Sequence, residues 1–279
     1  MKLRKHAVIL GFVGLLIVIA LIAFVRSPVG VALLRPKSHF VPCGENRAVL
    51  YEPGAESEAK KIARFLPQAI RVVEEGHFRN FKKPFKVYVC ATQESHNKFV
   101  GERSLYPIRG TAVLGSVLVA PSAFDFQGRD THRETLVHEL SHLHLAQQLG
   151  FLGRGEIPSW LTEGLANCLA GSGGEGISDK VAIASIVSGR HFVVEEKGSF
   201  AGSVRKSVAA AGLTPLMFHK QSKMFVGFIR NKKPDAFRRL LLDLQDGEPF
   251  APVFQEHFGV GVKAMWEDFR ANISSADLP

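Results

Sequence analysis

The sequence predicts an α+β fold, with a small mixed sheet in the first half and helices in the second half. Segments rich in β-branched residues occur between residues 85 and 121, whereas apolar residues recur at helical spacing from Thr131 onward. An apolar run precedes both parts and predicts one N-terminal transmembrane helix. With 279 residues, of which 46% are hydrophobic, the chain can bury a full core.

The N-terminal run from Ala7 to Val25 contains nineteen consecutive residues without a charged side chain. A helix of this length spans a bilayer core, so we expect a membrane anchor over residues 1–26 that contacts lipid through residues 7–25. A cleaved signal peptide is one alternative, but its apolar region should be shorter and should end in a small-x-small site. A buried core helix is the other, and it would need burial on every side.

The net charge of +9 is spread along the chain. Lys2, Arg4 and Lys5 precede the apolar run, and they favour a cytoplasmic N-terminus with the remainder in the periplasm, held at the cell membrane by a single pass. A nucleic-acid-binding protein should show clustered Lys and Arg on one element, with aromatic residues between them. The sequence shows no such element, so we expect contact with anionic lipid and none with nucleic acid.

Proline and glycine separate the apolar run from the rest of the chain. Residues 27–39 contain both and predict a juxtamembrane linker. One domain is expected to follow, over residues 40–279. We expect its sheet-containing part at residues 40–130 and its helical part at residues 131–279.

Helices and strands alternate in the expected sheet-containing part. Apolar residues recur at three- and four-residue spacing over residues 56–75, which predicts a helix. Residues 85–91 are rich in β-branched and aromatic side chains and predict a strand, after which a helix should begin near Thr92. Residues 111–121 predict two short strands that meet at a Gly-Ser turn.

Helical periodicity begins at Thr131 and continues toward the C-terminus. Thr131 and Glu134 form a capping-box pattern at the start of a helix that should end near Gly150. A second helix should begin at Pro158 and run to about Ala170. Further helices are expected over residues 178–188, 215–230, 234–244 and 262–273.

Three cysteines are compatible with two states. Cys43 and Cys90 could pair in an oxidising compartment, with Cys168 left within an apolar helix. The alternative is three unpaired, buried thiols. The sequence leaves both states open.

Residues 138–142 read His-Glu-Leu-Ser-His and lie on the capped helix. Four residues advance a helix by about 400°, so His138 and His142 project from nearly one face, where both imidazoles can reach one metal ion. Glu139 lies beside the pair, placed to accept a proton from metal-bound water. The pattern H-E-x-x-H also arises by chance in about one protein in a hundred, so a third ligand is needed to support it.

Glu163 is the candidate third ligand, twenty residues after His142 and near the start of the next helix. Two histidines and one carboxylate leave a fourth position for water, which is the open geometry that catalytic zinc requires. The alternative is an acidic residue stabilised by the helix dipole. Apolar neighbours on both sides of Glu163 favour a buried carboxylate paired with the metal.

These segments resemble the peptidase MA-like superfamily, the gluzincin zinc metallopeptidases. The resemblance is close over residues 131–170, where His-Glu-Leu-Ser-His is followed by Ile-Pro-Ser-Trp-Leu-Thr-Glu-Gly-Leu-Ala. It implies a thermolysin-like zincin core in which His138, His142 and Glu163 are the zinc ligands and Glu139 is the general base. It also implies that one edge of the strand pair around Val113 to Val119 holds an extended peptide.

A weaker resemblance, to small membrane-anchored bacterial members of the superfamily, extends to Trp266. These proteins usually have Tyr where this chain has His219, placed to stabilise the oxyanion. His219 could donate a hydrogen bond instead, or it could only pack within its helix. The Gly-x-Met-Glu-Asn segment of the aminopeptidases is missing from the sequence, which favours an endopeptidase.

Other polar residues near the motif have lesser expected roles. Asn167 lies four residues after Glu163, and the resemblance implies that it hydrogen-bonds and orients a ligand imidazole. His144 lies about 200° around the helix from His142, so we expect a packed histidine and not a ligand. His132, in the first helical turn, is expected to face solvent.

The chemistry of these residues predicts zinc-dependent hydrolysis of peptide bonds in a peptide or protein substrate. Zn²⁺ is the expected cofactor, and Glu139 is expected to activate a zinc-bound water. Two alternatives remain: a binding or scaffold protein that keeps the zinc fold without turnover, and a zinc hydrolase of a non-peptide amide. Retention of Glu139 favours an enzyme over a scaffold.

Overall fold

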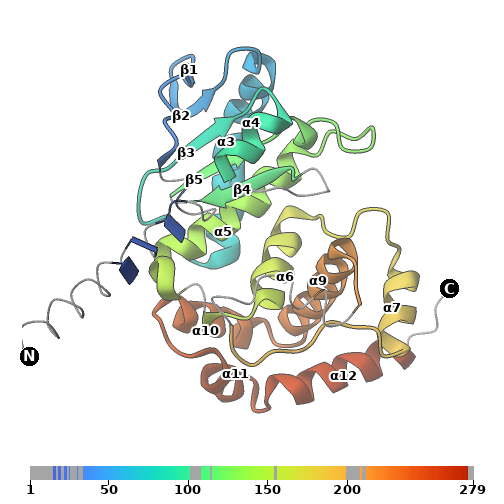
Figure 1. Cartoon of the computed structure of the whole chain (residues 1–279). Coiled ribbons are helices and arrows are strands. Elements are labelled where there is room, and N and C mark those ends of the chain that lie inside the picture. The colour runs from blue at the N-terminus through green and yellow to red at the C-terminus, as the bar shows by residue number, and fades with distance from the viewer. Residues whose placement is uncertain are drawn as a thin grey trace, which may run out of the picture. The chain divides into compact units, whose positions relative to one another are not determined.

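The computed structural model describes residues 34–100, 108–113, 115–153, 156–198, 208 and 212–275, with scattered positions between residues 15 and 30. The chain divides into two compact units, coloured along the sequence in Figure 1. Unit 1 contains Met1–Ala63 and Phe85–His132, and unit 2 contains Arg64–Pro84 and Arg133–Pro279. Residues 64–84 precede the expected boundary at residue 130, yet they belong to the helical unit.

Unit 1 contains a mixed five-stranded sheet in the order β1-β2-β3-β5-β4. Its strands are β1 (Val41–Cys43), β2 (Asn46–Tyr51), β3 (Lys86–Val89), β4 (Gly110–Val113) and β5 (Ser116–Val119). The three central strands run parallel, and the end strands β1 and β4 pair antiparallel to their neighbours. Val87 lies opposite Val117 and both side chains are fully buried, as expected for central strands covered on both faces.

Short helices and a helical turn accompany the sheet. They are the start of α3 (Glu56–His77), α4 (Gln93–Val100) and the 3₁₀ turn η1 (Pro121–Ala123). Phe40, Phe99 and Leu118 form a small core with Cys90. The helix predicted over residues 56–75 and the strand pair predicted over residues 111–121 are confirmed as α3 and as β4 with β5.

All three cysteines are free thiols. Cys43 ends β1 and Cys90 directly follows β3, and β2 lies between these two strands. Two strand spacings amount to about 9–10 Å, whereas a disulfide needs Cα atoms within about 7 Å. The alternative of a disulfide between Cys43 and Cys90 is therefore wrong.

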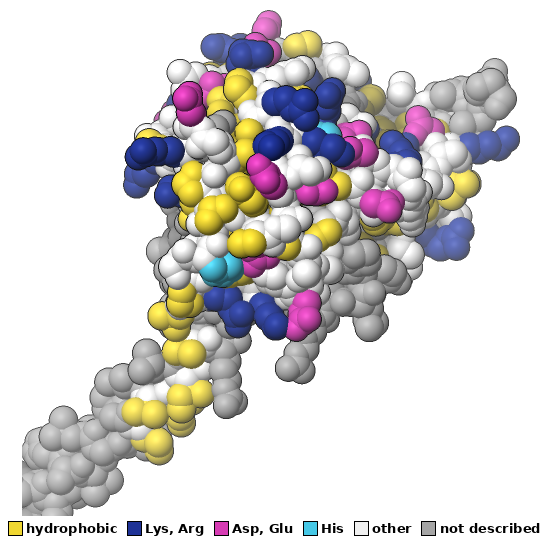
Figure 2. Space-filling model, turned by 90° about the horizontal axis from the view of Figure 1, so that it is seen from above, with side chains coloured by type: hydrophobic (Ala, Val, Ile, Leu, Met, Phe, Trp, Pro, Cys, Tyr) yellow, Lys and Arg dark blue, Asp and Glu magenta, His cyan; other side chains and the backbone are white. Residues whose placement is uncertain are grey.

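Charged side chains of both signs alternate on the face shown in Figure 2. Several lysines of unit 1 are paired with acids: Lys60 Nζ lies 2.9 Å from a carboxylate oxygen of Glu56, and Lys61 Nζ lies 2.9 Å from one of Asp130. Exposed pairs of this kind contribute little to stability. Their effect here is to neutralise the basic side chains locally.

Unit 2 is built from helices. They are the rest of α3, α5 (His132–Gly153), α6 (Ser159–Ala170), α7 (Asp179–Val187), α9 (Pro215–Lys232), α10 (Pro234–Gln245), α11 (Phe250–Phe258) and α12 (Val262–Ser275). In Figure 1, α6 and α9 lie side by side, and α12 runs beneath α7 and α9.

An aromatic core fixes three of these helices to one another. The ring centroids of Trp160 in α6 and Phe225 in α9 are 5.0 Å apart, and those of Phe225 and Trp266 in α12 are 4.9 Å apart. All three side chains are at most 2% exposed. Buried aromatic contacts of this size dominate core energetics, so α6 and α9 have a fixed relation on which a site can be built.

The ends of several helices are defined by caps or by a break in the backbone, although the predicted capping box at Thr131 is not among them, because the Thr131 hydroxyl donates to the backbone oxygen of Ala123 at 3.0 Å. The helix predicted from Thr131 to Gly150 is observed as α5, whose backbone leaves the helical conformation at Gly150, with φ 71°, before a last turn. Ser178 and Thr214 cap α7 and α9, each accepting a hydrogen bond from a backbone N–H of the first turn.

The described part of the chain contains no helix that is long enough and apolar enough to cross a bilayer. The predictions of a preceding transmembrane helix and of a single-pass location in the cell membrane are therefore wrong for the structure described here. The run from Ala7 to Val25 falls mostly outside the described residues. Composition gives the hydropathy of this run but not the backbone conformation that a span requires.

Candidate metal centre

The helix α5 places His138 and His142 one turn apart on the same face. Their Nε2 atoms lie 3.1 Å apart, and the rings meet edge to face with centroids 4.7 Å apart. This is the arrangement expected for two histidines separated by four helical residues. Both imidazoles therefore direct a ring nitrogen at the same small volume.

Glu163 approaches the same volume from α6. Its Oε2 atom lies 3.3 Å from His138 Nε2 and 3.4 Å from His142 Nε2. The Glu163 side chain is 14% exposed and that of His142 is 5% exposed. The three side chains form the one group of potential metal ligands found among the described residues, with one donor atom from each.

The spacing of these three atoms fits a metal ion better than it fits hydrogen bonding. Zinc bonds of about 2.0–2.1 Å in tetrahedral geometry put neighbouring ligand atoms about 3.3 Å apart. The observed separations are 3.1, 3.3 and 3.4 Å. A charge-assisted hydrogen bond to a carboxylate would be shorter, at about 2.7–2.9 Å. Two imidazoles and a carboxylate are also the ligand types that zinc accepts.

Glu163 is ionised in this environment. Burial alone raises the pKa of its carboxyl group, but the neighbouring imidazoles of His142 and His138 hold that pKa well below the ordinary value of 4.5. A metal ligand must be deprotonated before it binds. The carboxylate is therefore ready to bind a cation at neutral pH.

Glu139 directly follows the first histidine on α5 and is half-buried. One residue advances the helix by about 100°, so its side chain leaves the helix next to that of His138. Its carboxylate is not one of the three grouped ligand atoms. Glu139 is therefore not one of the candidate metal ligands.

His219 comes from α9 and lies against the group. Its Nδ1 atom is 3.0 Å from Asn167 Nδ2 and 3.5 Å from Glu163 Oε2, and its ring centroid is 5.9 Å from that of His138. Burial lowers the pKa of His219, more than the charge of Glu163 raises it. The structure thus brings His219 and Asn167 together beside the ligands, and Asn167 contacts His219 rather than a ligand imidazole.

Gly164 allows α6 and α9 to approach closely enough for this arrangement. A Cβ atom at Gly164 would lie 2.5 Å from the backbone oxygen of Ser222 and 2.5 Å from a methyl group of Val226. No larger residue fits without moving α9, because one of these contacts is with backbone. The glycine therefore sets the distance between Glu163 and His219.

The glutamine two residues beyond His219 anchors a loop. Gln221 is fully buried, and its side chain accepts a hydrogen bond from Phe192 N at 3.2 Å and donates to Arg190 O at 3.0 Å. It also donates to Ser185 Oγ at 3.3 Å. Within the His-x-Gln pattern, the histidine therefore lies beside the candidate ligands, and the glutamine holds the loop that contains Arg190 and Phe192.

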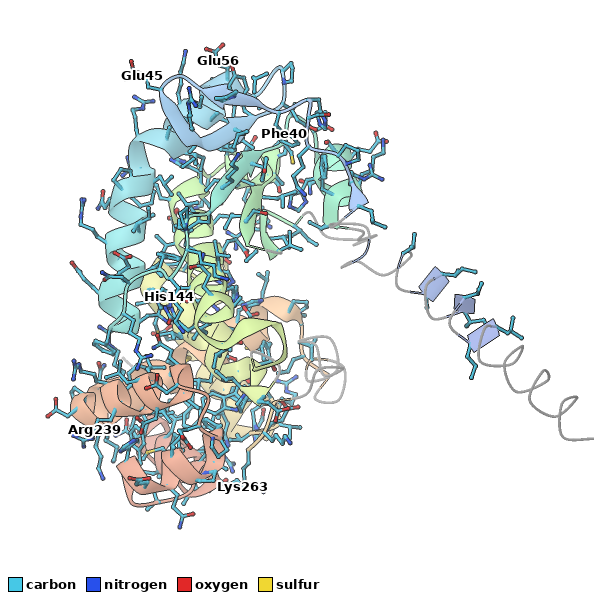
Figure 3. All side chains as sticks on the ribbon, turned by 90° about the vertical axis from the view of Figure 1, so that its left-hand side faces the viewer. Phe40, Glu45, Glu56, His144, Arg239 and Lys263 are labelled. Carbon is cyan, nitrogen blue, oxygen red and sulfur yellow. The ribbon has the colours of Figure 1, made fainter. Side chains whose placement is uncertain are left out.

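Two buried histidines support α5, and the sequence pattern predicted the packing of His144 but no role for His77. His77 Nε2 lies 2.8 Å from the hydroxyl oxygen of Ser141, the residue before His142. His144, labelled in Figure 3, donates from Nε2 to the backbone oxygen of Arg79 at 2.8 Å. Both side chains are fully buried, and His144 is a packed histidine as expected. His77 has no local sequence signal, because its partner is 64 residues away.

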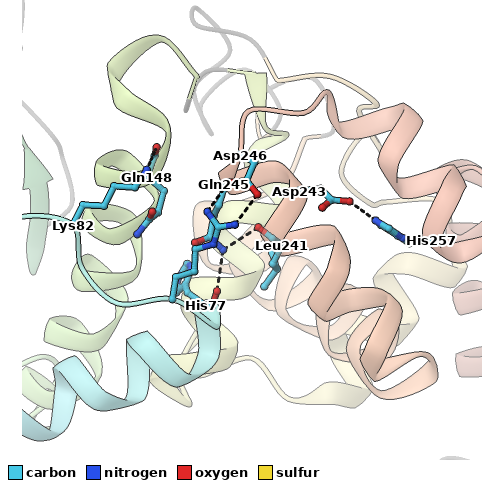
Figure 4. Close-up of polar contacts among 9 residues, drawn as sticks. His77, Lys82, Gln148, Leu241, Asp243, Gln245, Asp246 and His257 are labelled. Carbon is cyan, nitrogen blue, oxygen red and sulfur yellow. Dashed lines mark hydrogen bonds and ion pairs between the residues drawn. The ribbon is translucent and has the colours of Figure 1, made fainter.

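The loop after α3 is held in place by side-chain hydrogen bonds (Figure 4). Gln245 Nε2, at the end of α10, donates to the backbone oxygen of His77 at 2.9 Å. Lys82 Nζ donates to the backbone oxygen of Gln148 at 3.0 Å. These bonds tie both ends of the loop to neighbouring helices, which fixes His77 against α5.

The expectation that His132 faces solvent is wrong. His132 is only 8% exposed, and it pairs with Asp130 and stacks on Phe124 with ring centroids 5.4 Å apart. Its position in the first turn of α5 suggested a solvent-facing side chain. The aromatic residue of the preceding loop covers it instead.

No model of a known protein family matches the sequence, and no curated protein matches it. Solved structures similar to this chain include yeast LTA4 hydrolase in its native form, at 11% identity and a TM-score of 0.46. The same yeast enzyme in complex with bestatin is similar at 10% identity and a TM-score of 0.45. Each alignment covers 85% of this chain and 38% of the other, so this chain spans well under half of that length. Similarity at this level is too weak to carry a functional argument, which rests on the site geometry alone.

Proposed function

We propose that this chain is a zinc-dependent hydrolase that cleaves peptide bonds. The observation that carries the proposal is the convergence of His138 Nε2, His142 Nε2 and Glu163 Oε2 at separations of 3.1–3.4 Å. That spacing and that ligand set correspond to a catalytic zinc site with one position left for water.

Each remaining side chain has a part in the proposed reaction. A bound zinc ion supplies Lewis-acid chemistry, lowering the pKa of a water molecule and polarising a carbonyl group. Glu139 accepts the proton of the attacking water and passes it to the leaving amine. His219 donates a hydrogen bond to the carbonyl oxygen as negative charge develops on it.

The identity of His219 motivates one rival function. A protein with this histidine in place of tyrosine could keep the metal and bind peptides without cleaving them. Glu139 argues against that rival, because a binding protein has no use for a proton acceptor beside the ligands. Turnover therefore separates the two functions.

Metal content and proteolysis, measured together on the full chain, test the proposal. We expect about one zinc per chain and cleavage of a denatured protein mixture. Glu139→Gln should keep the zinc and abolish cleavage, whereas His142→Ala and Glu163→Ala should lose the zinc. His257→Ala is the control. His257 on α11 pairs with Asp243 on α10, outside the candidate metal centre, so this variant should keep both the zinc and the cleavage. Normal zinc content in both ligand variants would contradict the assignment.

We also propose that cleavage is internal to the substrate. The sequence contains no Gly-x-Met-Glu-Asn segment to bind a free amino terminus. Peptides with acetylated and free amino termini should then be cleaved at kcat/KM values within a few-fold of each other. A loss of more than about 100-fold on acetylation, equivalent to about 2.7 kcal/mol, would instead indicate an aminopeptidase.

A further inference from the structure

Asn167 is the polar residue most closely tied to His219. It lies four residues after Glu163 on α6, hence on the same face one turn further along. It is 2% exposed, and its Nδ2 atom is 3.0 Å from His219 Nδ1. A buried amide with a single ring partner at this distance makes a defined hydrogen bond.

The direction of that bond determines which ring nitrogen of His219 carries the hydrogen. An amide NH₂ group can only donate, so Nδ1 must be the acceptor, and the hydrogen of a neutral imidazole then resides on Nε2. Glu163 Oε2 competes for the same Nδ1 atom, but at 3.5 Å, which is long for an N–H···O hydrogen bond. The hydrogen bond from Asn167 at 3.0 Å, and not the contact with Glu163, therefore determines the tautomer of His219.

The glycine-rich loop after α6 confines the amide. A Cβ atom at Gly173 would lie 2.7 Å from Cγ and 2.9 Å from Oδ1 of Asn167, so only glycine fits against that side of the group. Gly173 also has φ 103°, a conformation that other residues rarely adopt. The loop backbone and the ring of His219 thus enclose the Asn167 amide from two sides.

We infer that Asn167 is a positioning residue that holds His219 in the tautomer with hydrogen on Nε2. Within the described residues, the polar contacts of His219 involve Nδ1, so the Nε2–H group is left to donate to a substrate carbonyl. The use of this donor in hydrolysis rests on the proposed function. The tautomer itself does not, because it follows from the contact with Asn167.

The isosteric change Asn167→Asp tests the inference, because a carboxylate can only accept and so requires hydrogen on Nδ1. Nitrogen-15 NMR of histidine-labelled full chain reports the protonation of each ring nitrogen, and His219→Tyr identifies the signals of His219. We expect Nε2 protonated and Nδ1 unprotonated in the unchanged protein, and Nδ1 protonated in Asn167→Asp. The kcat of this variant should fall about 100-fold, with zinc content and KM little changed.

Asn97→Asp is the matched control. It adds the same charge in unit 1, where Asn97 Oδ1 accepts from Gln93 and a carboxylate can do the same. It should leave the His219 signals and kcat unchanged. If Asn167→Asp does not fold, Asn167→Ala replaces it, and a mixture of both tautomers is expected.

Three outcomes would overturn the inference: protonated Nδ1 in the unchanged protein, a single Nε2–H tautomer in Asn167→Ala, or unchanged kcat in a variant whose tautomer has reversed. A protein without zinc or hydrolysis would defeat the proposed function alone. The NMR signature would still decide the tautomer in that case.

Discussion

At the scale of single residues, burial decides what each histidine can do. His138 and His142 turn their Nε2 atoms toward a carboxylate, whereas His77 turns its Nε2 toward the hydroxyl of Ser141 inside unit 2. Burial lowers the pKa of His77 well below the ordinary value of 6.5, so this imidazole is neutral in the folded protein. Its hydrogen bond with Ser141 supports α5.

This neutral histidine predicts a loss of stability in mild acid. Below about pH 6.5 the unfolded chain binds a proton at His77 that the folded chain does not, so each pH unit costs about 1.4 kcal/mol until the lowered pKa is reached. His77→Gln keeps a hydrogen-bonding group but cannot titrate. Urea unfolding at pH 5.5 and pH 7.5 should show a smaller difference for this variant than for the unchanged protein. Equal differences would mean that His77 is protonated in the fold.

At the scale of helices, the contact between α6 and α9 sets the geometry of the site. Glu163 and Asn167 are on α6 and His219 is on α9, so any separation of the two helices pulls these side chains apart. The contact depends on Gly164, where an added Cβ atom would meet the backbone of α9 at 2.5 Å. Backbone cannot rotate away as a side chain can.

Gly164→Ala should therefore weaken both the fold and the site. We expect a loss of about 1–3 kcal/mol of unfolding free energy from overpacking, together with weaker zinc binding. Gly227→Ala is the matched control, because this α9 glycine has open space around its Cβ position and should gain about 0.5–1 kcal/mol from helix propensity. Denaturant unfolding and zinc titration measure both effects. Full zinc affinity in Gly164→Ala would show that the helix spacing does not control the ligands.

Periodicity in the sequence located most helices to within a few residues, because an apolar stripe at helical spacing is a local property. It missed α11, where Pro252 in the first turn resembles a helix breaker, and it missed β1 and β2, where Pro42 and Arg47 interrupt any alternation. Spacing alone also paired His138 with His142. The segment around Glu163 also predicted that residue as a ligand, but the contact of Asn167 with His219 depends on how α6 packs against α9, which no local pattern encodes.

At the scale of the whole molecule, the candidate metal centre lies within one of the two compact units. All of its ligands, together with Asn167 and His219, belong to unit 2. Metal binding adds to the stability of whatever structure forms the site, by about 4 kcal/mol when free metal is a thousand-fold above its Kd. Zinc binding should therefore raise the free energy of unfolding of unit 2.

Removal of zinc should consequently loosen one unit and spare the other. On chelation we expect faster hydrogen exchange in α6 and α9, whose side chains converge on the site, and unchanged exchange in β3 and β5 of unit 1. His142→Ala should reproduce this pattern without a chelator, because it removes a ligand. Glu139→Gln should keep the protection of the zinc-loaded protein, because that residue is outside the ligand group. Equal loosening of β3 and α6 would show that the two units unfold together, and no change in either would show that zinc does not bind at this site.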